Sequence, residues 1–340
     1  MADNTILTFL YQFNIICCNK IFCLQNKKII FSVKISNMQI NTKKKLVAGL
    51  SITSNVILSV LKIITGVLSG SLSIISEAIH SLSDLFASLL TFFSVIKSSQ
   101  PADKDHPYGH GKYEDMAGFI EGDLIIFAAL LIIWEASKKI LFGFDMDTEN
   151  NLGIAVMLIA VVFNIIVSSL LFKVAKETNS ISLYADGEHL RTDVYSSLGV
   201  MFGLILIRVT GYSLLDPVIA IIVAAIIFRA GFSISNKAGS NLLDHSLPEE
   251  NINSIKQIIG NYSANVALKP ESLKARQVGP TKDIDLILQF EENTSICECH
   301  KICDEIEKQI CSLYPNCSIS IHSEPVCYKT DCQISCGKNK

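Results

Sequence analysis

Residues 71–114 read SLSIISEAIHSLSDLFASLLTFFSVIKSSQPADKDHPYGHGKYE, a long apolar run followed by a histidine-rich loop. The apolar run contains His80 and Asp84, four residues apart. Side chains with this spacing project from the same face of an α-helix, one turn apart. We therefore expect an imidazole and a carboxylate on one face of an otherwise apolar helix.

The same spacing returns in residues 184–207, YADGEHLRTDVYSSLGVMFGLILI, which contain His189 and Asp193. Two such helices side by side would bring together two imidazoles and two carboxylates, the ligands of a tetrahedral zinc-like site. Ionisable side chains inside a membrane cost about 2.5–3.5 kcal/mol each on insertion scales, so these four indicate a functional site. The alternative is that each His–Asp pair is a hydrogen bond that joins helices.

The composition divides the chain into a membrane part and a soluble part. Its 340 residues are 49% apolar with a mean hydropathy of +0.40, too apolar for an ordinary soluble protein and too long for a membrane bundle alone. The net charge of −3 and the lack of a basic stripe exclude nucleic acid as an expected partner. No nucleophile–base arrangement or nucleotide-binding loop is recognisable, so we do not expect an enzyme.

Hydropathy predicts six spans of about 20 residues. Lysines precede the first span and follow the second and fourth, which by the positive-inside rule makes these ends, and both termini, cytoplasmic. We expect a multi-pass protein of the cell membrane. The predicted spans are Leu46–Leu68, Leu72–Ile96, Met116–Ile140, Leu152–Val174, Leu183–Val209 and Leu214–Ile234.

The chain divides into four segments on this interpretation. Residues 1–42 form an N-terminal extension outside the fold, for which a disordered tail and a basic targeting segment both remain open. Residues 43–235 form the six-helix transmembrane domain. Residues 236–326 have the composition of a soluble domain, with an α-β-β-α-β order that predicts helices on one face of a three-stranded sheet. Residues 327–340 are a cysteine-containing tail.

Several of these motifs together resemble the cation diffusion facilitator family. They are HSLSD, QPADKDHPYGHGKYE, HLRTD, LLDHSLPEE and RQVGPT, spread over roughly residues 43–325. The resemblance implies a cytoplasmic ferredoxin-like α+β domain that dimerises, and cation/proton antiport by alternating access in a homodimer. It also implies that His80, Asp84, His189 and Asp193 form the transport site.

Charge counting gives a mechanism for such a site. Two carboxylates with two neutral imidazoles carry about two negative charges, which a divalent cation cancels and which protons would neutralise after the cation leaves. Imidazole with carboxylate favours a transition metal over magnesium or calcium. We expect proton-coupled zinc efflux without an organic cofactor. The alternatives are export of iron, manganese, cobalt or cadmium, or a metal sensor that does not transport.

A second set of ligands lies in the loop after the second span. His106 and His110 could share one metal ion if the loop forms a helical turn, and the resemblance adds Asp103 as the third ligand of a second zinc site. The alternative is that these loop histidines are only solvated. The resemblance also assigns Lys112 and Asp244 to a salt bridge at the dimer interface.

The resemblance maps a regulatory metal site onto three residues of the soluble domain. Two further positions, where the bacterial zinc transporters have histidines, are Glu271, which could still ligate, and Ile287, which cannot. Cys299 and Cys303 share a helix face and could supply softer ligands or simply be small core residues. The mapped residues are His300, His322 and Glu324.

Other polar residues of the predicted spans stay outside the site. They could line a hydrated path, lie at helix ends or form bonds between helices. They are Asn55, Glu77, Glu121, Asp123, Asn164, Asp186 and Glu188.

Overall fold

The computed structural model describes residues 39–69, 72–142, 151–210, 215–262, 266–269, 272–314 and 316–326. Some side chains inside the helices also lie outside this description, namely those of residues 66–69, 72–80, 82–83, 139, 142, 151–157, 200–210 and 215–216. The predicted N-terminal extension up to residue 38, the tail from residue 327, and the side chains of His80 and Glu271 therefore lie outside it.

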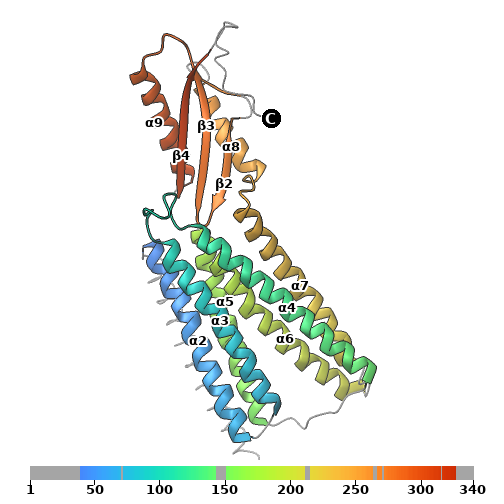
Figure 1. Ribbon diagram of the computed structural model, residues 1–340. Helices are drawn as coiled ribbons and strands as arrows, with labels where there is room; N and C mark the ends of the chain where they lie inside the picture. The colour runs from blue at the N-terminus through green and yellow to red at the C-terminus, as the bar shows by residue number, and fades with distance from the viewer. Residues whose placement is uncertain are drawn as a thin grey trace, which may run out of the picture.

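Six long helices form a bundle, and an α/β domain sits at one end of it (Figure 1). Helix α4 packs along α7, α2 along α3, and α5 along α6. Within the described residues, α2, α4, α5 and α7 are long and apolar enough to cross a membrane. The bundle helices are α2 (Ile40–Ser69), α3 (Leu72–Ser98), α4 (Lys112–Phe142), α5 (Asn151–Thr178), α6 (Ile181–Thr210) and α7 (Leu215–Leu242).

The helices run beyond the apolar spans at the end of the bundle next to the α/β domain, which we call the domain end. Helix α2 begins at Ile40, before the lysines, and α7 continues past Ser235 to Leu242. Hydropathy marks the apolar part of a helix, whereas backbone hydrogen bonding continues into polar residues. The composition change after Ser235 therefore falls inside a helix and not at its end.

Helices α4 and α7 approach closely because small residues face each other. A Cβ built on Gly122 would lie 2.6 Å from the backbone nitrogen of Ser235, and one built on Gly231 would lie 3.0 Å from the Gly122 carbonyl oxygen. Small residues let membrane helices pack backbone to backbone. A larger side chain at either glycine would separate the two helices.

A buried ion pair joins the helices at the domain end. The ammonium of Lys44 on α2 donates to the carboxylate of Glu114 on α4, and their side chains are 3% and 0% exposed. Ser98 also donates to Glu114, with 2.6 Å between the oxygens, and Ser180 donates to its other oxygen. Removing one partner of such a pair typically costs about 3–5 kcal/mol because the other charge stays buried.

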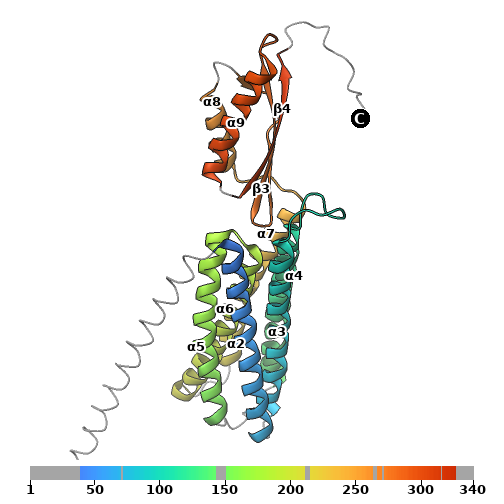
Figure 2. The ribbon, with the colours of Figure 1, turned by 90° about the vertical axis from the view of Figure 1, so that its left-hand side faces the viewer.

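The α/β domain is a sheet with both helices on one face (Figure 2). The central strand β3 pairs antiparallel with β1 and β2 along its length, and parallel with β4. The short strand β1 was not predicted, because three residues carry too little alternation. The elements are α8 (Glu249–Gly260), β1 (Val266–Leu268), β2 (Lys274–Val278), β3 (Thr281–Phe290), α9 (Ile296–Leu313) and β4 (Cys317–Pro325).

The core of this domain follows from the periodicity of its sequence. Ile255 and Ile259 recur at helical spacing on α8, and Ile306 and Ile310 do so on α9, and all four are buried. They pack against alternate residues of β3, which are Ile284, Leu286, Leu288 and Phe290. Each such side chain contributes about 1.5–3 kcal/mol when buried.

Asp115 joins the bundle to the α/β domain. Its carboxylate is fully buried and accepts hydrogen bonds from the Gly279 backbone nitrogen at 2.6 Å and from Asn241 Nδ2 at 2.9 Å. Gly279 has φ 54° and forms the turn between β2 and β3, where a Cβ would lie 2.3 Å from the Gly111 carbonyl oxygen. Only glycine fits this turn against the start of α4.

A chain of exposed charges runs beside this junction. Lys112 Nζ lies 2.9 Å from Asp244 Oδ1, and Arg276 bridges Asp244 at 3.0 Å and Asp283 at 2.8 Å. The hydrogen bond from Lys112 lowers the pKa of Asp244. Lys112 and Asp244 therefore pair within one chain. Their role at a dimer interface stays a prediction.

Candidate metal sites

Three of the four predicted transport-site residues meet inside the bundle. The ligand atoms of Asp84, His189 and Asp193 all lie within 4.8 Å of one another. Asp84 and His189 are 5% and 6% exposed, and His189 Nε2 lies 3.1 Å from Asp84 Oδ1. Two carboxylates and an imidazole that converge in this way can bind a divalent transition metal.

Helix geometry places these ligands at one level. Asp84 is on α3, whereas His189 and Asp193 are one turn apart on α6, so both motifs contribute from helices that pack together. His80 belongs to the same face of α3 as Asp84, one turn farther from the domain end. The side chain of His80 lies outside the described residues, so its place as the fourth ligand stays a prediction.

Neighbouring polar groups hold this site in position. Asn55 Nδ2 lies 2.6 Å from Ser88 Oγ and 3.4 Å from the Asp84 carbonyl oxygen. Ser88 in turn donates to Asp186 Oδ1 at 3.2 Å. The sequence marks Asn55 and Asp186 as polar residues of a span, but it does not mark Ser88, because one serine in an apolar helix carries no distinguishing signal. Such supporting contacts orient ligands and tune their affinity.

A small polar cavity of about 40 Å³ adjoins the site. Asp84 and Asp193 line it together with Asn55 and Asn164. Lys62 and Ser81 also line it, and Lys62 Nζ donates to Ser81 Oγ at 2.7 Å. These last two residues lie on the side of the site away from the domain end, so the cavity extends from the ligands in that direction.

The loop residues Asp103, His106 and His110 also converge, with ligand atoms within 4.8 Å of one another. Asp103 Oδ1 accepts the His106 backbone N–H at 2.7 Å, which folds the loop and lowers the pKa of Asp103. Asp103 Oδ2 lies 3.3 Å from Nε2 of the buried His110. Gly109, at φ 85°, permits the tight turn between the two histidines.

The three residues of the expected regulatory site are only partly gathered in the α/β domain, where His300 and Glu324 line the same pocket. His300 is on α9, whereas His322 and Glu324 are on β4, and within the part of the chain that the structure describes they form no convergent ligand group. His300 Nδ1 lies 3.6 Å from Asp304, and Glu324 binds Lys269 at 2.8 Å. His322 Nε2 lies 3.8 Å from Glu324.

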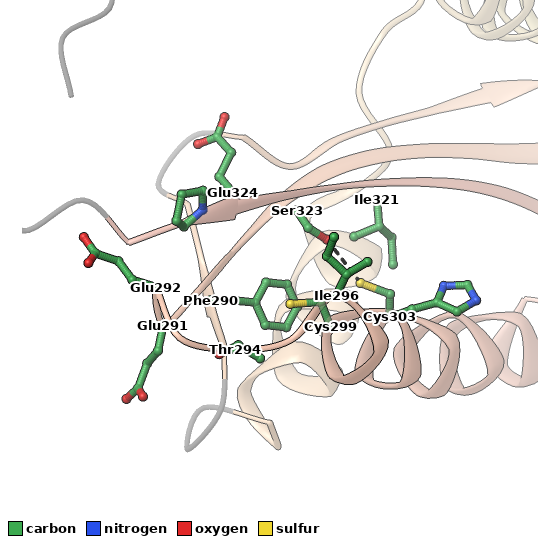
Figure 3. A pocket seen from close by; sticks show the side chains of 12 residues that line it. Phe290, Glu291, Glu292, Thr294, Ile296, Cys299, Cys303, Ile321, Ser323 and Glu324 are labelled. Atoms are coloured by element: carbon green, nitrogen blue, oxygen red, sulfur yellow. Dashed lines mark hydrogen bonds between the residues drawn. The ribbon is translucent and has the colours of Figure 1, made fainter.

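A pocket of about 390 Å³ lies between α9 and the end of β4 (Figure 3). Cys299 and Cys303 line it from α9, and Cys303 Sγ lies 3.6 Å from Ser323 Oγ. Burial raises the pKa of the Cys303 thiol, so at neutral pH the thiolate that binds metals is disfavoured. Both cysteines also pack against the domain core, which favours a structural role.

Comparisons with known proteins agree with this architecture. A family model described as the cation efflux transmembrane domain matches residues 49–243, and one described as the cation efflux protein cytoplasmic domain matches residues 247–326. The chain is 32% identical to the uncharacterized transporter sll1263 of Synechocystis sp., over 76% of this chain and 83% of the relative. It is 31% identical to the cation-efflux pump FieF of Citrobacter koseri, over 84% and 94%.

The relatives and family models span both parts of the chain, the bundle and the α/β domain. The predicted family is therefore confirmed, together with a multi-pass membrane protein of the transporter class. The chain belongs to the cation diffusion facilitators, the cation efflux family.

Proposed function

We propose that this protein exports a divalent transition metal, zinc first, from the cytoplasm in exchange for protons. It works as a homodimer with six spanning helices, both termini cytoplasmic, in the cell membrane. The domain end of the bundle is then the cytoplasmic end. The observation that carries the proposal is the convergence of Asp84, His189 and Asp193 inside the bundle.

The metal would bind to these three residues and to His80. Removing the metal leaves two carboxylates in a low dielectric, where bare charge is unfavourable, so protons replace it on the carboxylates or the imidazoles. The His189–Asp84 contact at 3.1 Å is a hydrogen bond that such a proton would occupy. Metal and protons therefore compete for the same lone pairs, which couples their movements in opposite directions.

The donor set supports zinc but also fits a second candidate. Imidazole with carboxylate ligands suits zinc, iron, cobalt and manganese to different extents, and affinity order alone does not choose among them. A relative that covers 84% of this chain is named only as a cation-efflux pump, which leaves iron or manganese as the second candidate cargo.

The test is metal uptake into proteoliposomes that contain the purified protein and an imposed pH gradient. Zinc, iron and manganese are compared in parallel, for the unchanged chain and for Asp193→Ala. We expect zinc uptake that follows the pH gradient and is absent from the variant. Equal flux in both proteins would exclude the proposed site, and flux of iron or manganese alone would change the cargo but not the mechanism.

A further inference from the structure

A series of buried polar side chains leads from the transport site to the domain end, and none of them belongs to the ligand set. The first step is Asp186, about one turn nearer the domain end of α6 than His189. It is fully buried, and its Oδ1 accepts the Ser88 hydroxyl at 3.2 Å. Ser88 and Asn55 connect this carboxylate to the transport site.

The second step is Glu121 on α4, about 13 Å from the domain end of that helix at about 1.5 Å per residue. Its side chain is fully buried, and Oε1 accepts the hydroxyl of Thr91. Glu121 and Asp186 lie on helices that pack together, α4 and α6, so each carboxylate lies within the electrostatic influence of the other. Thr91 also lies 3.5 Å from the carbonyl oxygen of Ser182.

The third step reaches the domain end through hydroxyl groups. The hydroxyls of Ser182 and Ser180 lie 3.3 Å apart, and Ser180 donates to Glu114. Glu114 is the carboxylate of the ion pair with Lys44. Buried polar groups, namely carboxylates, hydroxyls and the Ser182 carbonyl, therefore recur between the transport site and the domain end.

Glu121 and Asp186 each keep one carboxylate oxygen without a hydrogen-bond partner among the described residues. The charged groups facing Glu121 are Asp186 and His189, and those facing Asp186 are His189, Asp193 and Glu121. No lysine or arginine of the described part of the chain is among them. Two unneutralised carboxylates this deep are costly, whereas a proton on either of them removes much of that cost.

We propose that Glu121 is the acceptor of protons leaving the transport site toward the cytoplasm. A metal ion arriving at the site takes up a lone pair that held a proton. That proton passes by way of Asp186 to the free oxygen of Glu121, forming an O–H bond there. It then leaves Glu121 toward the cytoplasm, along the part of the bundle lined by Thr91, Ser182 and Ser180. This assignment rests on the proposed antiport function.

The chemistry of this step favours a proton over the metal itself. Glu121, Asp186 and their neighbours Thr91 and Ser88 offer only oxygen donors, whereas transition metals in proteins favour sites that include imidazole. A hydroxyl can both donate and accept, so the contacting Ser182 and Ser180 side chains can pass a proton on to Glu114. The absence of Glu121 from the ligand group among the described residues agrees with this division of roles.

The experiment measures zinc uptake and lumenal pH together in proteoliposomes carrying the unchanged chain or Glu121→Gln. The matched control is Glu135→Gln, which removes an exposed carboxylate farther along the same helix. We expect Glu121→Gln to slow zinc-driven proton movement at least about 10-fold, less than the roughly 100-fold at which the contributions of positioned proton-transfer groups begin. Zinc affinity, measured by titration in detergent, should stay within about two-fold, and Glu135→Gln should match the unchanged chain.

The outcomes separate this inference from the proposed function. If the unchanged chain moves no protons with zinc, the antiport proposal fails first. If it does, and Glu121→Gln moves as many protons at the same rate, the inference is overturned. It is also overturned if Glu121→Gln raises the zinc concentration for half-maximal flux with unchanged coupling, since Glu121 would then bind metal. If Glu121→Gln does not fold, Thr91→Val serves instead, because it keeps the Glu121 carboxylate but removes the hydroxyl that donates to it. The rate of proton movement and the zinc concentration for half-maximal flux are then judged in the same way.

Discussion

The helix bundle and the α/β domain carry similar ligand residues in different settings. Asp84 and His189 are almost fully buried on two packed helices, with 3.1 Å between their nearest ligand atoms. The side chains of His300 and His322 are 76% and 71% exposed, and each lies nearest a carboxylate of its own helix or strand. A ligand set therefore needs rigid elements that hold the donors at one point, and residue type alone does not supply it.

The largest expected effect on transport comes from changing the buried ligands Asp84, His189 and Asp193, which we call the buried set. Asp84→Asn keeps the shape of the side chain but removes the charge that would balance a divalent cation. We expect a loss of metal affinity and of transport of at least about 100-fold, because supporting residues alone typically account for about 10–100-fold. Transport in proteoliposomes and metal titration in detergent measure it.

The control for this change is Asp123→Asn, which alters an exposed carboxylate of α4 that bonds to Ser235. It should transport at close to the rate of the unchanged chain. Normal transport by Asp84→Asn would remove the distinction between the two regions.

The three loop ligands are intermediate in exposure between the bundle site and the α/β domain. His110 is buried, whereas Asp103 and His106 are exposed. His106→Ala should lower the affinity of one metal equivalent about 10-fold and leave the remaining binding unchanged, because Asp103 and His110 still converge. Isothermal titration with zinc would resolve the two classes. His245→Ala, in an exposed turn, is the control, and an unchanged isotherm for His106→Ala would mean that the loop histidines are only solvated.

A smaller effect is expected in the α/β domain. The double variant His300→Ala, His322→Ala should change metal affinity and transport by less than about 3-fold, because these exposed imidazoles do not converge in one chain. Zinc titration of the full-length protein tests this expectation. Loss of a complete metal equivalent would show instead that a second copy of the chain, or a domain rearrangement, completes the site.

The buried set is more predictable from the sequence than the fold around it. Four-residue spacing fixes which side of a helix a ligand occupies, so His189 and Asp193 could be grouped from their spacing alone. Contacts between residues far apart in the sequence leave no comparable repeating pattern. The Lys44–Glu114 contact joins residues 70 positions apart, and nothing in the local pattern around either charge indicates the other. The separation of His300 from His322 depends on how α9 lies over β4, which the order of elements does not determine.

The two regions meet at the Lys112–Asp244–Arg276 charges, where the smallest effect is expected. Asp244→Asn removes the charge but keeps a residue that tolerates φ 58°. Because these side chains are 33–44% exposed, solvent screening limits the stability contribution to no more than about 1 kcal/mol. A change this small would show that these exposed charges contribute little to holding the two regions together.

The pH dependence of this variant checks the assignment. The hydrogen bond from Lys112 lowers the folded-state pKa of Asp244 below its ordinary value of 3.8. The unfolded chain therefore binds this proton more tightly, so the carboxylate stabilises the fold fully above about pH 4, and the contribution is lost as the pH falls through the folded pKa. Thermal melting should separate the unchanged chain from Asp244→Asn at about pH 7 and bring them together as the pH falls through the lowered pKa of Asp244, whereas Glu292→Gln, at an exposed site, should match the unchanged chain throughout. If the two melting temperatures still differ at the lowest pH, Asp244 acts through its backbone conformation and not through its charge.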